Sequence, residues 1–349
     1  MPRKQSVSSL GGVLPVIKPA GPTSHDVVQV ARRVLQQRAI GHTGTLDPAA
    51  EGLLLLCIGP YTKLVPYLVE SDKTYDGYIG LGIETTTDDS EGAPTLVGDA
   101  REVTLERVRQ FAKRFTGEIE QVPPRYAAVK VAGKKLYEYA RENIEVTIEP
   151  RPVTVFSFDI LDLHDADSPA DILARVDPPH ADAPKTIKRA QFVTRVSSGT
   201  YVRALARDLG RDLGCGGYLA QLSRSAVGRF DLQVAMPYDV LTNSPDRVDE
   251  YLVRGAAALD SKRYPMLKLL PAYVDRLFRG QPLHEKMMDD MDAAAGLNSG
   301  AIVGIASDDG ALLAVMQAER FETQMRENVY NSRFAVHFKP LRIFPNGLK

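Results

Sequence analysis

Consecutive strand-like segments follow one another in this chain, and several of the connections between them are too short for parallel crossovers. Short apolar runs typical of strands occur at Val13–Ile17, Leu53–Ile58, Thr74–Leu81, Val153–Leu163 and Phe192–Val196. Parallel neighbours in a sheet need a crossover of about a dozen residues or more, whereas antiparallel neighbours need only a short turn. The segment order therefore predicts an α+β fold with a mixed, mostly antiparallel central sheet and flanking helices.

Three segments show the apolar spacing of an amphipathic helix. In each, apolar residues recur every three or four positions and form one face that can pack on a sheet. Polar caps and glycines mark the expected ends. The predicted helices are one that begins near His25 with Thr23 or Ser24 as its cap, one that follows Thr104 and ends at Gly117, and one over Tyr201–Leu213 that ends at Gly214.

The end of the chain differs in character and predicts a second domain. With 349 residues, the chain fits one large domain plus a smaller one. Asp308-Asp309-Gly310 separates two short apolar runs, which is a strong hairpin signal. We expect a first domain over 1–250 and a small β-rich domain over 265–349, with Thr242–Asp260 as a candidate boundary. The polar stretch Leu163–Lys188 is expected to be a surface loop or insertion.

Composition excludes several classes of protein but selects no partner. The net charge is −1, so charge alone does not predict binding to a nucleic acid. Cys57 and Cys215 lie far apart and lack metal-ligand spacing, which is typical of a reducing, cytosolic compartment. The sequence shows neither a signal peptide nor an apolar run near the ~20 residues that span a bilayer. We therefore expect a cytoplasmic protein without a membrane segment.

The segment Gly41–Gly52 is a loop rich in glycine and proline, directly before a buried strand. Its glycines Gly41 and Gly44 allow backbone conformations that other residues avoid, and Pro48 restricts Asp47 to extended conformations. Two interpretations follow from these residues alone. The loop either forms a plain turn, which is the commoner role of Asp-Pro, or holds the Asp47 carboxylate in a defined pose.

Several motifs follow one another in a fixed order from Lys18 to Arg224. They are Lys18–Asp26, Gly41–Gly52 with Gly59 and Thr62–Leu64, Lys73–Tyr75, Thr85–Asp88 with Gly92, Pro123-Pro124, Tyr126–Lys130, Gly133–Arg141, Ser198–Arg203 and Leu222–Arg224. Together they closely resemble the signature of the TruB family of tRNA pseudouridine-55 synthases, of the bacterial type. An ordered set of this length is far more specific than any one motif.

The resemblance implies a pseudouridine synthase fold with a PUA-like domain at its C-terminal end. It implies an enzyme that isomerises the uridine at position 55, in the T-loop of tRNA, to pseudouridine. The glycosidic C–N bond breaks and a C–C bond forms without gain or loss of atoms, and neither a cofactor nor a metal is implied. Ile17, Ala49 and Glu51 depart from the family pattern, and Glu51 adds a charge near the loop.

The resemblance also implies three catalytic residues. Asp47 is the expected nucleophile, and it attacks either the ribose C1′ or the base C6. Arg203 is expected to orient Asp47 as an ion pair, although Arg203, Arg207 and Arg211 at spacings of four would by themselves indicate a solvated helix row. Tyr75 is expected to stack on the extruded uracil and to act in proton transfer at C5, whereas a tyrosine in a strand is more often a core residue.

Four further residues are expected to form the substrate pocket. Tyr201 and Leu222 line it in the family pattern. Lys18 supports the loop that carries the nucleophile, through structure or through chemistry. His42 either fills the space that the flipped base vacates or holds this loop in place, and the sequence favours neither role.

Segment 121–150 is expected to be an RNA-binding loop, since Lys130 and other basic residues there interleave with tyrosines. The resemblance implies tRNA as the partner of a monomer, with no protein partner and no membrane. Three alternatives stay open: a non-catalytic RNA-binding or RNA-folding module, a synthase of the same family that modifies ribosomal RNA in a guide-RNA complex, and a glycoside hydrolase, which would need two carboxylates.

Overall fold

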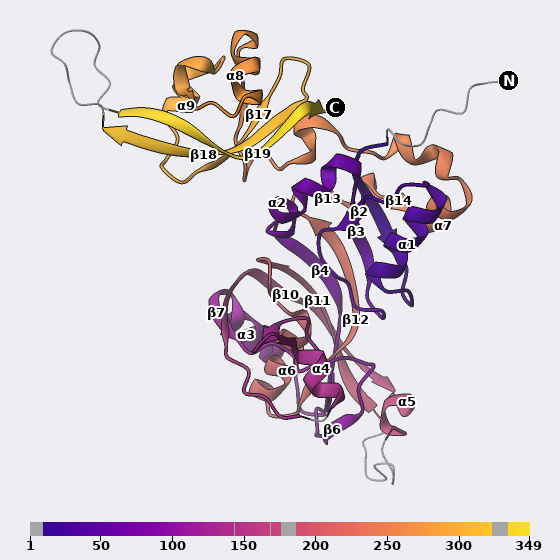
Figure 1. The fold of residues 1–349 in the computed structure, drawn as a ribbon. Helices are drawn as coiled ribbons and strands as arrows, with labels where there is room; N and C mark the ends of the chain where they lie inside the picture. The colour runs from indigo at the N-terminus through magenta and orange to yellow at the C-terminus, as the bar shows by residue number, and fades with distance from the viewer. Residues whose placement is uncertain (1–9, 143, 168, 176–185, 323–333) are drawn as a thin grey trace.

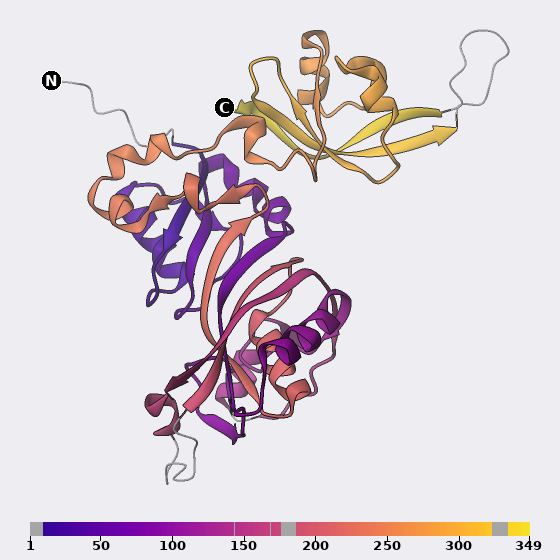
Figure 2. The same cartoon turned by 180° about the vertical axis from the view of Figure 1, so that it is seen from behind.

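The computed structural model of the protein describes residues 10–142, 144–167, 169–175, 186–322 and 334–349. These residues form a long central sheet with helices packed on it and a separate C-terminal sheet beyond one end of it (Figure 1). The same two-part arrangement is visible from behind (Figure 2). No helix among these residues has both the length and the apolar character that crossing a membrane requires.

The central sheet is built from strands of both halves of the chain. Its strands are β1 (Gly12–Lys18), β2 (Ile40–His42), β3 (Glu51–Ile58), β4 (Lys73–Leu81), β7 (Gly117–Gln121), β10 (Arg151–Asp167), β11 (Thr186–Val196), β12 (Gly217–Val227), β13 (Phe230–Asp231) and β14 (Met236–Pro237). They follow the order β14-β1-β3-β12-β4-β11-β10-β7, with β2 beside β3 and β13 beside β12. The β1–β14 and β3–β12 pairs are parallel and the other pairs are antiparallel. The expected mixed, mostly antiparallel sheet is confirmed.

Helices lie on the sheet where the apolar stripes predict them. Helix α1 (Ser24–Val34) is capped by Thr23, whose side chain accepts a hydrogen bond from the Asp26 backbone N–H, and it packs against β1 and β3. Helices α3 (Leu105–Ala112) and α6 (Val202–Leu213) share a second apolar core with β4, β10, β11 and β12. Gly214 ends α6 in the left-handed region, as predicted.

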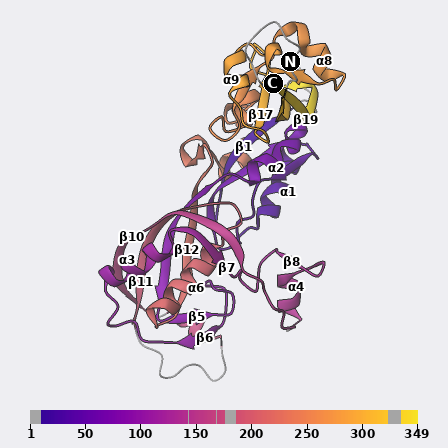
Figure 3. The same cartoon turned by 90° about the vertical axis from the view of Figure 1, so that its left-hand side faces the viewer.

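The remaining elements of the first domain are short. They are α2 (Val65–Val69), β5 (Ile83–Thr85), β6 (Pro94–Val97), β8 (Lys130–Val131), β9 (Lys134–Lys135), α4 (Leu136–Arg141), α5 (Ala170–Leu173) and α7 (Tyr238–Asn243). The group of β8, β9 and α4 forms a hairpin-and-helix unit, called here the β8–α4 unit, which stands apart from the sheet (Figure 3).

The predicted end of α3 at Gly117 is wrong. The helix ends at Ala112, a 3-10 turn follows over 113–115, and Gly117, at φ +109°, begins β7. Glycine tolerates this positive φ, so it marks the entry into a strand here as readily as it could mark the end of a helix. The residue type identified a break in the chain but not which element it borders.

The interpretation of Leu163–Lys188 as a surface loop is also wrong where the structure describes it. Strand β10 continues to Asp167, β11 begins at Thr186, and these two residues are paired. The exposed side chains of this strand end are polar, which hides the alternation of a strand in the sequence. Helix α5 follows, and the rest of the stretch lies outside the described residues.

The stretch Thr242–Asp260 packs on the first domain over most of its length and contacts the C-terminal sheet at its end, where the Ala256 N–H donates to the Gly310 carbonyl. Its 3-10 turns cover 245–250 and 255–258, and Val253 pairs with Val13 of β1 through two backbone hydrogen bonds of 2.9 Å. Val248 is buried in the same core as α1. The weak apolar patterning therefore reflects irregular but packed backbone.

The C-terminal sheet has the order β15-β17-β18-β19-β16. Its elements, which all lie between Met266 and Leu348, are β15 (Met266–Lys268), α8 (Val274–Phe278), β16 (Leu283–His284), α9 (Met291–Ala295), β17 (Ile302–Ala306), β18 (Leu312–Glu322) and β19 (Phe334–Leu348). The predicted hairpin around Asp308-Asp309-Gly310 is confirmed as the β17–β18 connection. This small β-rich unit is the expected PUA-like arrangement.

Tyr61 joins the two sheets. Its hydroxyl accepts a hydrogen bond from the Gly255 backbone N–H at 2.6 Å and donates one to the Lys349 carbonyl at 3.2 Å. Around it, apolar residues of β3 and of β18 and β19 form one buried cluster. The two sheets thus share a core as well as a chain.

Both cysteines are buried and unpaired. Cys57 lies in β3 and Cys215 follows α6, with relative exposures of 0% and 1%. Burial raises the pKa of the Cys57 thiol to about 12 and that of Cys215 to about 11. The two thiols are therefore packing residues rather than nucleophiles or metal ligands.

We expect Leu205→Ala to destabilise the protein strongly. Leu205 is fully buried between α6 and the sheet, so the smaller side chain leaves a cavity and should lower the free energy of unfolding by ~2–5 kcal/mol. Urea denaturation followed by circular dichroism measures this loss. The matched control is Leu161→Ala, at 48% exposure, which should change stability by less than ~0.5 kcal/mol. Equal losses would contradict the assignment of this core.

Candidate active site

The loop over 43–50 is fixed to helix α1 and strand β1 from below. The Ser24 hydroxyl accepts a hydrogen bond from the Leu46 N–H at 2.8 Å and donates to the Leu46 carbonyl at 3.1 Å. The Gly21 N–H donates to the Pro48 carbonyl at 2.8 Å. These bonds satisfy buried backbone groups on both sides of Asp47, so the carboxylate has a defined direction.

Lys18 is fully buried beneath the same loop. Its ammonium group donates to the carbonyls of Pro48 and Ala50, at 3.2 and 2.6 Å, and to that of Pro19 at 2.9 Å. Burial lowers the pKa of Lys18, while the Asp47 and Glu51 carboxylates raise it. The unexpected Glu51 therefore lies where it favours the charged form of the lysine that holds the loop.

Arg224, 2% exposed, secures the other end of the loop. From β12 its guanidinium donates to the Gly44 carbonyl at 3.1 Å and to the Leu53 carbonyl at 2.7 Å. Gly44 has φ +153°, and a side chain there would approach the Arg224 guanidinium at 3.5 Å. The glycine thus lets the loop backbone pass close to a buried cation.

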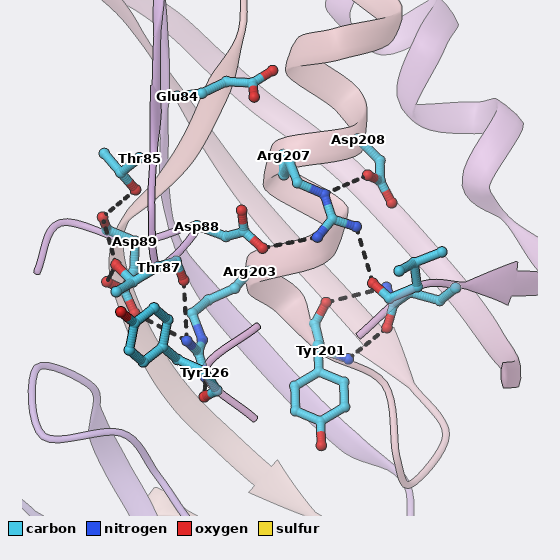
Figure 4. Close-up of polar contacts among 12 residues, drawn as sticks. Glu84, Thr85, Thr87, Asp88, Asp89, Tyr126, Tyr201, Arg203, Arg207 and Asp208 are labelled. Atoms are coloured by element: carbon cyan, nitrogen blue, oxygen red, sulfur yellow. Dashed lines mark hydrogen bonds and ion pairs between the residues drawn. The ribbon is translucent and has the colours of Figure 1, made fainter. Parts of the chain in front are cut away.

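Arg203 contacts the Asp47 carboxylate directly. Its Nε lies 3.1 Å from Oδ2 and its Nη2 lies 3.5 Å from Oδ1, a side-on ion pair. The same guanidinium approaches Asp89 at 3.4 Å and donates to the Thr87 and Tyr126 carbonyls at 3.1 and 3.2 Å (Figure 4). Arg203 is 7% exposed, so nearly all of its donors are used inside the protein. The expected ion pair is present, and the interpretation of a solvated arginine row is wrong at this position.

A cavity of about 490 Å³ opens beside this ion pair. Its wall includes Asp47, Arg203, Tyr75, Tyr201 and Leu222. Tyr75 comes from β4, Tyr201 precedes α6 and Leu222 comes from β12, so the central strands and the start of one helix meet here. The volume lies in the range of small-ligand pockets, about 300–1,000 Å³.

The charge on Asp47 is set by two opposing effects. Its side chain keeps 42% of its area open to the cleft, but surrounding protein removes much of its hydration. This desolvation raises the pKa of Asp47, Arg203 lowers it, Asp89 raises it and Lys18 lowers it. Desolvation is the largest of these effects, so the pKa of Asp47 stays above its ordinary value, and the Arg203 and Lys18 cations limit the rise.

Three of the predicted binding residues lie outside the cavity wall: Lys18, which is buried beneath the loop, His42 and Lys130. His42 is half-buried in β2, and its Nδ1 accepts a hydrogen bond from the Gly44 N–H at 3.3 Å. This contact is of the loop-holding kind. Lys130 is exposed in β8, on the β8–α4 unit.

Sequence reasoning assigned no role to three residues of the site. Asp89 is an 8% exposed carboxylate on the far side of Arg203. Lys73 lines the cavity, donates to the carbonyls of Val69 and Ser71 at 2.7 and 2.6 Å, and has a pKa lowered to about 8 by burial. Arg224, described above, is the third. Lys73 and Arg224 lie within two of the motifs and Asp89 directly follows another, but the ion pair of Asp89 and the loop contacts of Arg224 join segments far apart in sequence.

The described residues contain no group of three or more His, Cys, Asp or Glu side chains arranged to hold a metal ion. The donors around the cavity are instead arginine, lysine and tyrosine. Such a set suits the orientation of an anionic group and an aromatic base rather than the ligation of a cation.

Solved structures share the fold of this chain. The chain is similar to a structure described as "Structure of H/ACA RNP bound to a substrate RNA containing 2'-deoxyuridine", with a TM-score of 0.64 and 21% identity, covering 95% of this chain and 84% of that one. A second likeness is to the "archaeal box H/ACA sRNP Nop10-Cbf5 complex", with a TM-score of 0.63 and 20% identity over 95% of this chain and 85% of that one. These likenesses show that the chain shares its fold with both structures over most of its length.

Curated relatives identify the family. Residues 32–202 match the description "TruB family pseudouridylate synthase (N terminal domain)". The "tRNA pseudouridine synthase B" of Mycobacterium sp. (strain KMS) is 38% identical over 88% of this chain and 92% of its own length. That of Aromatoleum aromaticum (strain DSM 19018 / LMG 30748 / EbN1) is 40% identical over 86% of this chain and 89% of its own length. The chain belongs to the TruB family of pseudouridylate synthases.

We expect Arg203→Met to raise the pKa of Asp47. Removal of the guanidinium leaves the desolvation and the Asp89 charge, both of which favour the protonated carboxyl. The ionised form would then be lost at a higher pH than in the parent protein. A carboxyl-carbon NMR titration measures the shift. Arg195→Met, which removes a 57% exposed arginine paired with Asp72, should leave this titration unchanged, and an unshifted Asp47 in Arg203→Met would contradict the ion pair.

Proposed function

We propose that this protein isomerises the uridine at position 55, in the T-loop of tRNA, to pseudouridine, with Asp47 as its nucleophile. The observation that carries the proposal is the Asp47 carboxylate held by Arg203 at the wall of a cavity that also contains Tyr75. The relatives named tRNA pseudouridine synthase B support tRNA as the substrate.

The target uridine must leave the RNA stack before it can enter the cavity. Base flipping costs a few kcal/mol, and stacking on an aromatic side chain returns ~1–3 kcal/mol per base. Tyr75, which is 8% exposed at the cavity, takes the stacking role. Tyr201 and Leu222 supply further apolar wall, so the uracil ring is held in its plane while its bond to the ribose changes.

Asp47 then acts as the covalent nucleophile. Its attack on the ribose C1′ expels the uracil directly, whereas attack on the base C6 leads to the same break of the C1′–N1 bond through a base adduct. The uracil turns and C5 bonds to C1′, and the bond to Asp47, at C1′ or at C6, breaks to release the carboxylate. The C5 proton leaves with Tyr75 as the nearby acid–base group, and N1 takes up a proton. No atom is gained or lost overall. Arg203 orients the carboxylate throughout, and Lys18 and Ser24 keep its loop in place.

The β8–α4 unit provides basic and aromatic contacts beside the cavity. Lys134 lies 5.0 Å from the Tyr139 ring centroid, and Lys135 and Arg141 lie 5.4 and 5.3 Å from that of Tyr137. Tyr137 also lines the cavity. These pairs are half-buried apart from the exposed Arg141, and their mixed cationic and aromatic character suits contact with phosphates and bases. We assign this unit to the phosphate backbone of the T-arm.

Two other functions are less well supported. The structures with guide-RNA descriptions share only 20–21% identity with this chain, whereas relatives at 38–40% identity carry the tRNA name. A purely RNA-binding module would not require the buried ion pair at the cavity. We also propose that the protein works as a monomer in the cytoplasm, where its tRNA substrate is processed.

We expect Asp47→Asn to abolish pseudouridine formation while tRNA binding changes little. The amide keeps the shape of the carboxylate but cannot act as the nucleophile. Incubation with an unmodified tRNA transcript, with pseudouridine scored at each uridine, measures turnover, and filter binding measures affinity. Asp76→Asn, on the other face of β4 from Tyr75, is the matched control and should keep full turnover. Retained turnover in Asp47→Asn, or product at a uridine other than position 55, would refute the proposal.

We expect tRNA affinity to fall steeply with salt concentration, because phosphate contacts release counterions. Lys130→Gln should weaken binding for all RNA sequences alike and lower the slope of log K against log salt by about one. Lys339→Gln, at 64% exposure on the C-terminal sheet, is the charge-matched control. An unchanged slope in Lys130→Gln would remove this lysine from the RNA interface.

A further inference from the structure

Two arginines of helix α6 bridge the same two segments of the chain. One segment is the loop Thr87–Asp89, and the other is Gln121–Tyr126, which leads into the β8–α4 unit. Arg203 spans them through Thr87, Asp89 and the Tyr126 carbonyl. One helical turn further on, Arg207 spans them again (Figure 4).

The contacts of Arg207 are short and well aligned. Its Nη1 lies 2.8 Å from the Asp88 carboxylate, its Nε lies 2.8 Å from Asp208, and its Nη2 donates to the Val122 carbonyl at 3.0 Å. The Arg207 and Asp88 side chains are 9% and 13% exposed. This guanidinium is therefore a structural group inside the protein and not part of a solvated surface row.

Further hydrogen bonds hold one bridged segment to Tyr201 at the start of α6 and the other to Leu219 of β12. The Gln121 side chain accepts a hydrogen bond from the Tyr201 N–H at 2.8 Å and donates to the Tyr201 carbonyl at 3.1 Å. On the other side, the Leu219 N–H donates to the Asp88 carbonyl at 2.9 Å. Asp88 has φ +61°, a conformation that residues with a side chain rarely adopt without support. Asp88 thus stays in this backbone conformation while its side chain binds Arg207.

A buried ion pair is a costly way to join two segments. Replacing such a pair by apolar residues of similar volume is often neutral or stabilising, so its presence points to geometry rather than to stability. A guanidinium fixes its partners in both distance and plane, which an apolar contact does not. In one segment Arg207 binds Asp88, which lies between the Thr87 and Asp89 groups that Arg203 holds, and in the other it binds Val122, which precedes Tyr126.

We propose that Arg207, paired with Asp88, is a positioning residue for the reaction. It fixes the spacing between the Thr87–Asp89 loop and the base of the β8–α4 unit, and so holds Arg203 in its side-on contact with Asp47. The inference rests on the proposed function, because it assigns Arg207 to the orientation of that nucleophile. The cavity wall contains Arg203 but not Arg207, so Arg207 acts on the cavity through the two segments that it bridges.

The test compares Arg207→Met with the parent protein on saturating tRNA transcript. A displacement of Arg203 by about 1 Å can cost up to ~100-fold in rate, so we expect kcat to fall ~10- to 100-fold. Affinity for tRNA should stay within ~3-fold, since no phosphate contact is removed. The charged groups around Asp47 are Arg203 on α6, Asp89 and Glu91 on the loop, and Lys18 on β1. With Arg203 loosened, the acidic limb of the kcat–pH profile should move to higher pH.

Arg211→Met is the matched control. Arg211 lies one further turn along α6 and pairs with Glu84 at 2.8 Å, but its side chain is 56% exposed and bridges neither segment. We expect its kcat to remain within ~2-fold of the parent value. Asp88→Asn serves as a second variant that keeps the side-chain shape while removing the charge. It should show a smaller loss of kcat, ~5-fold, and the same direction of pH shift.

Each outcome decides the question. Loss of kcat with an acidic limb at higher pH in Arg207→Met, or in Asp88→Asn if the first variant does not fold, supports the positioning role. A folded Arg207→Met or Asp88→Asn with parental kcat and pH profile overturns it. So does an equal loss in Arg211→Met, which would indicate general damage to the helix. A parent protein without pseudouridine formation would instead refute the proposed function.

Discussion

The arrangement of the active cleft depends on one buried guanidinium, that of Arg203. It is enclosed by two carboxylates, from Asp47 and Asp89, and by the carbonyls of Thr87 and Tyr126. A cation removed from water is stable only when its donors are satisfied, so these four groups must assemble whenever the protein folds. Three segments that are distant in sequence are thereby placed around the start of α6. The loop that carries Asp47 is one of them, and its own backbone bonds to Ser24 and Lys18 complete the alignment.

The sheet order explains why these segments meet. β12 and β4 lie at the centre of the sheet, between β3 and β11. Strand β3 follows the Asp47 loop, β4 carries Tyr75, β12 carries Leu222, and β11 leads through a short turn to α6. Mostly antiparallel pairing brings residues from both halves of the chain to one place, which a sequence of local units could not do. The cleft is a property of the whole first domain.

Periodic elements and ordered motifs were the parts of the structure that sequence could predict. The Leu53–Ile58 run, the stripe of α1 and the helix ended by Gly214 have local causes, namely apolar spacing and caps, so their positions followed from the residues. The motif order also placed Asp47, Tyr75 and Arg203 in one site, and the structure brings them to one cavity. By contrast, Asp89 and Arg224 act through partners that no local spacing reveals, and the polar end of β10 hid its alternation. Gly117 marked a break but not its kind.

The two native thiols have a practical consequence for following this enzyme at work. Both are sealed in packed interior and poorly ionised at neutral pH, so a maleimide dye has nothing to react with on the folded chain. A single cysteine introduced at an exposed site would then carry the fluorophore alone, without prior removal of Cys57 or Cys215. A donor fluorophore on the β8–α4 unit of the protein and an acceptor on the tRNA would report docking by energy transfer, in an otherwise unaltered protein.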